Sequence, residues 1–271
     1  MTDAPEAPAQ PGALVERDGN VMIITLNRPE ARNAVNSAVS VGVGDALEEA
    51  QRDPDVRAVV ITGAGDKSFC AGADLKAIAR RENLYHPDHP EWGFAGYVHH
   101  FIDKPTIAAV NGTALGGGTE LALASDLVVA DERAKFGLPE VKRGLIAAAG
   151  GVFRIVHQLP RKVGMELLLT GEPLTASDAW EWGLINQIVK EGEGSVLDAA
   201  LALAARVTVN APLSVQASKR IAYGVDDGVI VDDEAGWERT MREMRTLIRS
   251  EDATEGPLAF AEKREPVWKA R

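Results

Sequence analysis

The sequence predicts an α/β fold with parallel strand pairing. A buried strand, a glycine-rich turn and a helix follow one another about three times before residue 131. After residue 144 the pattern becomes mostly helical. The length of 271 residues suits one large domain, or one domain with an appended subdomain.

The elements follow from residue spacing. Residues 13–17 and 21–26 flank Asp-Gly-Asn and predict a β-hairpin. Val39, Val43, Ala46 and Ala50 are spaced as on one face of a helix over residues 37–52. Further along, we expect strands at 56–62, 106–110 and 127–130, and helices at 74–81, 93–102 and 117–124.

The C-terminal part is predicted to be helical. Two apolar helix faces indicate this: Val196, Ala200, Leu203 and Val207, and then Trp237, Met241, Met244 and Ile248 on a helix over 229–249. Pro212 and Pro257 are expected near helix starts. The chain therefore divides into a disordered N-terminal arm at 1–12, an α/β core at 13–195 and a helical region at 196–271.

Composition argues against several classes of protein. The net charge of −11 disfavours a nucleic-acid partner, which would require a basic face. The single cysteine, Cys70, allows no intramolecular disulfide and is interpreted as a small buried filler. No apolar run reaches the length of a membrane span, and the N-terminus does not resemble a signal peptide. We expect a cytoplasmic protein without membrane contact.

Two glycine-containing turns indicate a binding site for a negative oxygen. The segment NGTALGGGTE (111–120) opens a helix at Gly117 or Gly118, where free backbone N–H groups and the helix dipole favour an anion. Taken alone, three glycines could serve packing only. However, SFCAGADLK (68–76) also follows a strand and opens a helix. Donors from both turns could form an oxyanion hole.

Two carboxylates accompany these turns. Glu120 heads an apolar helix, where an unpaired charge is costly to bury. Glu140 follows Pro139 at a predicted helix start, where a carboxylate could simply complement the helix dipole. Together they could hold a water molecule and exchange protons with it.

These motifs resemble the crotonase superfamily, the enoyl-CoA hydratases and isomerases, over residues 13–267. The resemblance is carried by LNRPEARNA (26–34), SFCAGADLK, KPTIAAVNGTALGGGTELALASDLVVA (104–130), AKFGLPEVKRGL (134–145) and LLLTGEPLTASDAWEWGLINQIV (167–189). It implies a crotonase-type spiral of ββα units with a helical C-terminal oligomerisation region, assembled as a homotrimer or as a hexamer of two trimers. It also implies an acyl-CoA thioester substrate and no metal or other cofactor, since coenzyme A is part of the substrate.

The resemblance also implies roles for individual residues. The oxyanion donors fall on the N–H groups of Ala73 and Gly117; Glu120 would act on water, and Glu140 would deliver the proton to Cα. The implied CoA- and substrate-binding positions are Arg32, Ala34, Ala71, Gly72, Ala73, Asp74, Leu75, Lys76, Gly116 and Gly117. The cations expected to face the CoA phosphates are Arg28, Arg32, Lys67 and Lys76.

The acyl group is left open. Hydratases often carry Pro-Gly-Ala-Gly-Gly after the second glutamate, whereas this chain has IAAAGG (146–151), which resembles the subset similar to carnitinyl-CoA dehydratase. The segment 81–100 is expected to shape the acyl pocket with Tyr85, Trp92, Phe94 and Tyr97. Enoyl-CoA hydratase is the expected activity, with a Δ3,Δ2-enoyl-CoA isomerase and a carnitinyl-CoA-type dehydratase as alternatives on the same site.

Other classes of function fit the residues less well. A Clp-type serine protease shares the ββα spiral, but none of His86, His89, His99, His100 and His157 lies in a motif that ties it to a nucleophile. The same histidines lack matched partners for a metal site. An RNA-binding or scaffold protein on this fold conflicts with the acidic charge.

Overall fold

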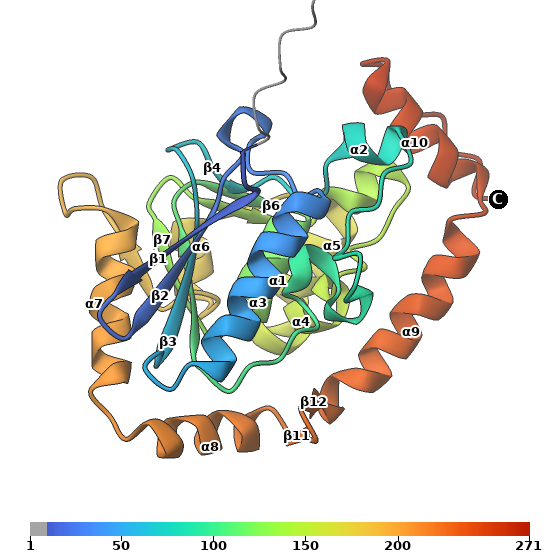
Figure 1. The fold of residues 1–271 in the computed structure, drawn as a ribbon. Helices are drawn as coiled ribbons and strands as arrows, with labels where there is room; N and C mark the ends of the chain where they lie inside the picture. Colours follow the sequence, from blue (N-terminus) through green and yellow to red (C-terminus); the bar gives the residue numbers. More distant parts are fainter. Residues whose placement is uncertain (1–9) are drawn as a thin grey trace, which may run out of the picture.

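The computed structural model describes residues 10–271, and residues 1–9 of the predicted arm lie outside this range. Two sheets and their helices form a core, around which the last three helices, α8 to α10, run along the base and one side (Figure 1). Asn27 anchors the start of the described chain, since its N–H donates to the Gly12 carbonyl and its side-chain amide to Pro11.

Within residues 10–271, ten strands form two larger sheets, and β11 and β12 form a separate two-stranded sheet. In the larger, ordered β1-β2-β3-β5-β7-β10, only β1 is antiparallel to its neighbour. In the smaller, ordered β4-β6-β8-β9, only β9 is antiparallel. The large-sheet strands are β1 (Ala13–Asp18), β2 (Val21–Leu26), β3 (Ala58–Gly63), β5 (Thr106–Val110), β7 (Leu127–Asp131) and β10 (Gln187–Val189). The small-sheet strands are β4 (Ser68–Cys70), β6 (Thr113–Leu115), β8 (Lys135–Gly137) and β9 (Leu174–Thr175).

Successive strand pairs build a spiral. The pairs β3–β4, β5–β6 and β7–β8 each give their first strand to the large sheet and their second to the small one. A helix follows each pair, so the predicted ββα spiral with parallel pairing is confirmed. These helices are α2 (Leu75–Ala79), α3 (Gly117–Ala124) and, after the 3-10 helix η4 (Pro139–Arg143), α4 (Gly151–Gln158).

The large sheet is covered on both faces. Helix α1 (Ser37–Arg52), capped by the Asn36 side chain, buries Val39, Val43, Ala46 and Ala50 against one face, as their spacing predicts. Helix α7 (Val196–Thr208) buries Val196, Ala200 and Ala204 against the other. The predicted boundary at residue 195 therefore precedes a helix that packs on the core sheet, and the chain leaves the sheet only after α7.

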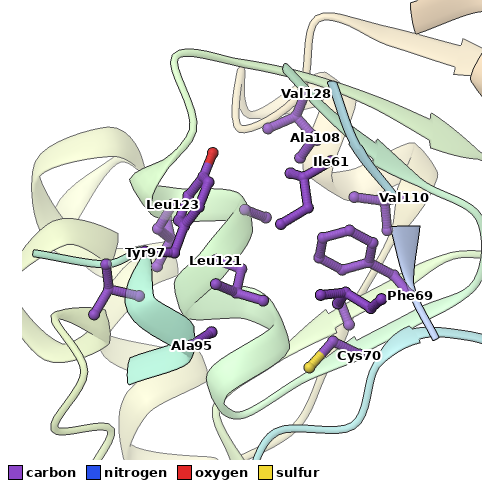
Figure 2. Packing of buried hydrophobic residues seen from close by; sticks show 14 of the residues in the cluster. Ile61, Phe69, Cys70, Ala95, Tyr97, Ala108, Val110, Leu121, Leu123 and Val128 are labelled. Carbon is purple, nitrogen blue, oxygen red and sulfur yellow. The ribbon is translucent and has the colours of Figure 1, made fainter. Parts of the chain in front are cut away.

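Helix α3, which the glycine-rich segment opens, is embedded in the core. Figure 2 shows Leu121 and Leu123 of α3 in the same cluster of buried apolar side chains as Ile61 and Phe69. All of α3 from Gly117 to Leu123 is buried. Residues at its N-terminus are consequently held as firmly as the core itself.

Two predictions about helices are wrong. Residues 93–102 form no α-helix and contain only the short 3-10 helix η3 (Phe94–Gly96), which follows η2 (Pro90–Trp92). The reason is that Gly93, Ala95 and Gly96 have φ angles of 74°, 60° and 62°, which a right-handed helix cannot contain. Pro257 lies inside α10 rather than near its start. Pro212 does begin α8, as predicted.

The remaining elements complete the C-terminal half. They are α5 (Arg161–Thr170), α6 (Ala176–Glu181), α8 (Pro212–Ala222), β11 (Val225–Asp226), β12 (Val229–Ile230), α9 (Val231–Leu247) and α10 (Glu251–Ala261). Within residues 10–271 no single helix has the length and apolarity to cross a membrane; α7 and α8 meet the test only together, with a bend of 103° between them.

The C-terminal helices leave apolar side chains exposed. Leu213 and Ile221 of α8 are 78% and 81% exposed, and Met241 and Ile248 of the predicted stripe also face solvent, whereas its Trp237 packs within the chain on Phe153. We propose that these exposed side chains contact neighbouring copies of the chain, because such a surface is unfavourable in water.

We therefore expect light scattering to give the mass of a trimer or hexamer for the purified protein. Replacing Leu213 and Ile221 together by Glu should lower that mass, because charges would be buried at the contact. The matched control, Ser214→Glu, places a charge at an exposed polar position of the same helix. A monomeric wild-type protein would overturn this proposal.

Candidate active site

Glu120 lies in the first turn of α3 and is only 4% exposed. Its Oε1 accepts a hydrogen bond of 2.9 Å from the N–H of Gly151, the first residue of α4. Burial raises the pKa of Glu120 to about 8, and the charge of Glu140 adds to this rise, while the amides of Gly151 and Ala149 oppose it. The carboxyl group can therefore hold or release a proton near neutral pH.

Glu140 lies in η4, with Pro139 at its start, as the sequence predicts. Its Oε1 packs on Gly116, where a Cβ would approach it to 2.8 Å. Its Oε2 is buried and has no hydrogen-bond partner within residues 10–271. Burial raises the pKa of Glu140 to about 7. Two carboxyl groups that titrate near neutrality thus interact in one site.

The two glycine-containing turns meet beside these glutamates. Gly72, at φ 90°, lies so close to α3 that a Cβ there would be 3.1 Å from the backbone nitrogen of Gly117. In the described part of the chain, neither the N–H of Ala73 nor that of Gly117 donates to a protein acceptor. The structure therefore brings the predicted oxyanion donors to adjacent turns and leaves both available to a ligand oxygen.

The predicted CoA-binding segments also lie side by side. Three backbone hydrogen bonds of 2.8–3.0 Å join them: the N–H of Ala71 donates to the Arg32 carbonyl, that of Val35 to the Gly72 carbonyl, and that of Asp74 to the Val35 carbonyl. In this pair of segments, Arg32, Ala71, Leu75 and Lys76 are exposed, whereas Ala34, Gly72 and Asp74 are buried. Gly116 and Gly117 are buried beside them.

Two of the predicted binding residues have structural partners. Asp74 caps α2 by accepting the N–H groups of Lys76 and Ala77, and it forms an ion pair of 2.9 Å with Arg28. Arg28 also donates to the Ala34 carbonyl at 2.6 Å. The Arg28 guanidinium therefore ties the two segments together, and its contact with the CoA phosphates stays a prediction. Of the four predicted cations, Arg32, Lys67 and Lys76 are exposed.

The aromatic residues of segment 81–100 divide into two groups. The Phe94 ring packs on Gly117. The pKa of Tyr85 is raised, mainly by burial and in addition by the negative charge of Glu120. Trp92 is stacked between His89 and His100 at 4.0 and 4.2 Å. Tyr97 is buried, with its hydroxyl 2.8 Å from Ser125 Oγ. Phe94 and Tyr85 border the glutamates, whereas Trp92 and Tyr97 support the loop.

Sequence reasoning missed the groups that hold Glu120. In the sequence, IAAAGG indicates only a resemblance to a subset of the family, whereas in the structure Gly151 supplies the amide that binds Glu120. Arg154, one turn later, is buried and also lowers the pKa of Glu120. A glycine pair that opens a helix was the available signal, since such a helix start offers free N–H groups.

Comparison with known proteins agrees with this geometry. The family model described as enoyl-CoA hydratase/isomerase matches residues 16–271. A carnitinyl-CoA dehydratase of Salmonella agona is 43% identical over 258 residues, which cover 94% of this chain and 97% of that protein.

Solved structures give the same result. A carnitinyl-CoA dehydratase from Mycobacterium avium 104 is 83% identical, with a TM-score of 0.93 over 97% of this chain and 100% of its own. An enoyl-CoA hydratase from Mycobacterium tuberculosis H37Rv is 44% identical, with a TM-score of 0.74 and the same coverage. The chain belongs to the enoyl-CoA hydratase/isomerase family, the crotonase superfamily, and within it to the subset that resembles carnitinyl-CoA dehydratase.

Proposed function

We propose that this protein catalyses the reversible addition of water to a 2-enoyl-CoA thioester, with Glu120 and Glu140 as its acid–base pair. One observation carries the proposal: the buried Glu120 and the half-buried Glu140, with pKa values of about 8 and about 7, interact beside two backbone N–H groups that have no protein acceptor within residues 10–271. Near neutral pH such a pair holds one proton between its two members. One member can then act as base while the other acts as acid.

The dehydration direction illustrates the mechanism. The thioester oxygen accepts hydrogen bonds from the N–H groups of Ala73 and Gly117, which stabilise the negative charge that develops on it. The Glu140 carboxylate removes the Cα proton and forms the enolate, and protonated Glu120 donates its proton to the departing hydroxyl group at Cβ. The products are a 2-enoyl thioester and water. Hydration reverses each step, and neither direction transfers electrons, so no redox cofactor is needed.

The surroundings of Glu120 favour this assignment. Its burial and the neighbouring charge of Glu140 both favour its protonated form, so the shared proton is assigned to Glu120. Protonated Glu120 with ionised Glu140 is the state from which dehydration starts. The same pair needs the opposite protonation state at the start of hydration, which costs about 1.4 kcal/mol per pKa unit.

We propose carnitinyl-CoA as the first substrate to test, because relatives over nearly the whole chain bear that name. The proposed contact surface for CoA is the pair of segments at 32–35 and 71–76, with exposed Arg32 and Lys76, together with exposed Lys67 just before β4. Carnitinyl-CoA should yield a new conjugated enoyl absorbance, and a series of 2-enoyl-CoA thioesters should lose theirs. A protein that converts none of these thioesters would overturn the proposed function.

The first prediction concerns the two glutamates. Gln keeps the shape of Glu but cannot exchange a proton, so Glu120→Gln and Glu140→Gln should each lower kcat by about 10²–10⁴-fold. Because the two groups act as a unit, the double variant should retain more activity than the product of the single effects implies. Initial rates with a 2-enoyl-CoA measure this. Wild-type hydration by Glu120→Gln, together with an inactive Glu140→Gln, would overturn the two-carboxylate mechanism.

The second prediction is a bell-shaped pH profile. Below pH 7 both carboxyl groups are protonated and no base remains; above pH 8 both are ionised and no acid remains. We expect kcat/KM to peak between about pH 7 and pH 8. Steady-state rates from pH 5 to pH 10 test this. A plateau that extends down to pH 5 would show that neither carboxyl group titrates near neutrality.

The third prediction isolates one oxyanion donor. A Cβ at position 117 would overlap the Phe94 ring, so both Gly117→Ala and Gly117→Pro disturb packing, but only proline removes the N–H group. Proline is otherwise tolerated in the first turn of a helix. We expect Gly117→Pro to have a kcat about 10²–10³-fold below that of Gly117→Ala. Equal kcat values in two folded variants would exclude this N–H group as a donor.

A further inference from the structure

A buried ion pair joins α9 to the core. Arg154 of α4 donates from Nη2 and Nε to Asp233 Oδ2 of α9, at 2.7 and 3.1 Å. Its Nη1 donates to the Val98 carbonyl at 2.9 Å. The two side chains are only 9% and 17% exposed although they are 79 residues apart in the sequence. Such a pair contributes little net stability, because the cost of removing both charges from water offsets their attraction, but losing one partner leaves the other charge uncompensated.

This ion pair lies next to the turn that binds Glu120. Gly150, at φ 99°, immediately precedes the Gly151 amide that donates to Glu120. A Cβ on Gly150 would be 3.0 Å from Arg154 Nη1 and 3.1 Å from the Trp237 ring of α9. The guanidinium and the indole therefore pack together on the residue that aims this amide.

We propose that Arg154 and Asp233 are positioning residues, through which α9 holds the start of α4 and fixes the orientation and charge state of Glu120. The inference rests on the proposed function, because it concerns the same carboxyl group. It assigns helix α9 a part in the chemistry. No contact of either residue with substrate is required.

The charges around Glu120 set the expected directions. Glu120 interacts electrostatically with Glu140, Arg154, Tyr85 and Cys70: the charges of the first two shift its pKa, and its own charge raises the pKa of the last two. Among these, the cation of Arg154 lowers the pKa of Glu120. Removing that cation should raise the pKa of Glu120 further, because the ionised form loses a favourable charge.

Removing the counter-charge of Arg154 should have the opposite effect on the pKa of Glu120. Asp233 is the ion-pair partner of Arg154, and the positive charge of Arg154 also lowers the pKa values of His99, Tyr97 and Tyr223. Asp233→Asn leaves the cation without its counter-charge. The pKa of Glu120 should then fall, since the net positive charge beside it increases.

The experiment compares three variants with the wild type. Arg154→Met should move the alkaline limb of the pH profile upward, and Asp233→Asn should move it downward, each by about 0.3–1 pH unit. The double variant should return close to wild type. The control, Glu238→Gln, removes an exposed carboxylate from the same helix and should leave the limb unmoved. A purely structural pair would lower kcat without opposite shifts of the limb, and that result would overturn the inference.

A second readout does not depend on activity. The carboxyl carbon of Glu120 in ¹³C-glutamate-labelled protein, assigned by its absence in Glu120→Gln, can be titrated directly by NMR. Opposite shifts of its midpoint in Asp233→Asn and Arg154→Met support the inference even if no thioester is converted, in which case only the proposed function fails. If Arg154→Met does not fold, the nearly isosteric Asp233→Asn suffices: an unchanged midpoint in that variant would overturn the inference.

Discussion

The close approach of strand β4 to the start of α3 is the constraint on which the site depends. A Cβ on Gly118 would overlap the Cys70 carbonyl, and one on Gly72 would reach 3.1 Å from the nitrogen of Gly117. Only glycine permits backbones to lie this close. A side chain at either position would push α3 away from β4, separate the N–H groups of Ala73 and Gly117, and move Glu120 away from Gly151. The glycines therefore set the geometry that the functional groups share.

The same packing buries Glu120, so that its ionised form lowers the stability of the folded state. With a pKa near 4.5 when unfolded and about 8 when folded, its carboxyl group binds a proton more tightly in the native protein. That contribution to stability is fully present below pH 4.5 and is lost as the pH rises to about 8, at roughly 1.4 kcal/mol per pH unit. The hydrogen bond from Gly151 offsets only part of this loss. A residue kept for stability alone would be apolar here, as Leu121 and Ala122 are.

The repeated strand, turn and helix pattern could be read from the sequence because each unit has a local signal. The buried strands are short apolar runs, and α1 shows its face at spacings of three and four residues. The turn at 93–96 could not be predicted in this way, since three positive φ angles and the stacking of Trp92 override an apparent helical run. The ion pair of Arg28 with Asp74 could not be predicted either, because the two residues are 46 positions apart. Distant pairings decide whether a charge is free, and local sequence does not contain them.

The C-terminal helices contact both carboxylate-bearing regions from outside. Helix α9 reaches the turn behind Glu120 through Asp233 and Trp237. Helix α10 packs on η4, which carries Glu140: a Cβ on Gly256 would overlap the Arg143 backbone, and the Arg143 guanidinium lies 4.0 Å from the centre of the Phe260 ring. Acid–base catalysis by two groups requires a fixed separation between them. Because each glutamate is braced by a different C-terminal helix, the relative placement of α9 and α10 bears directly on that separation.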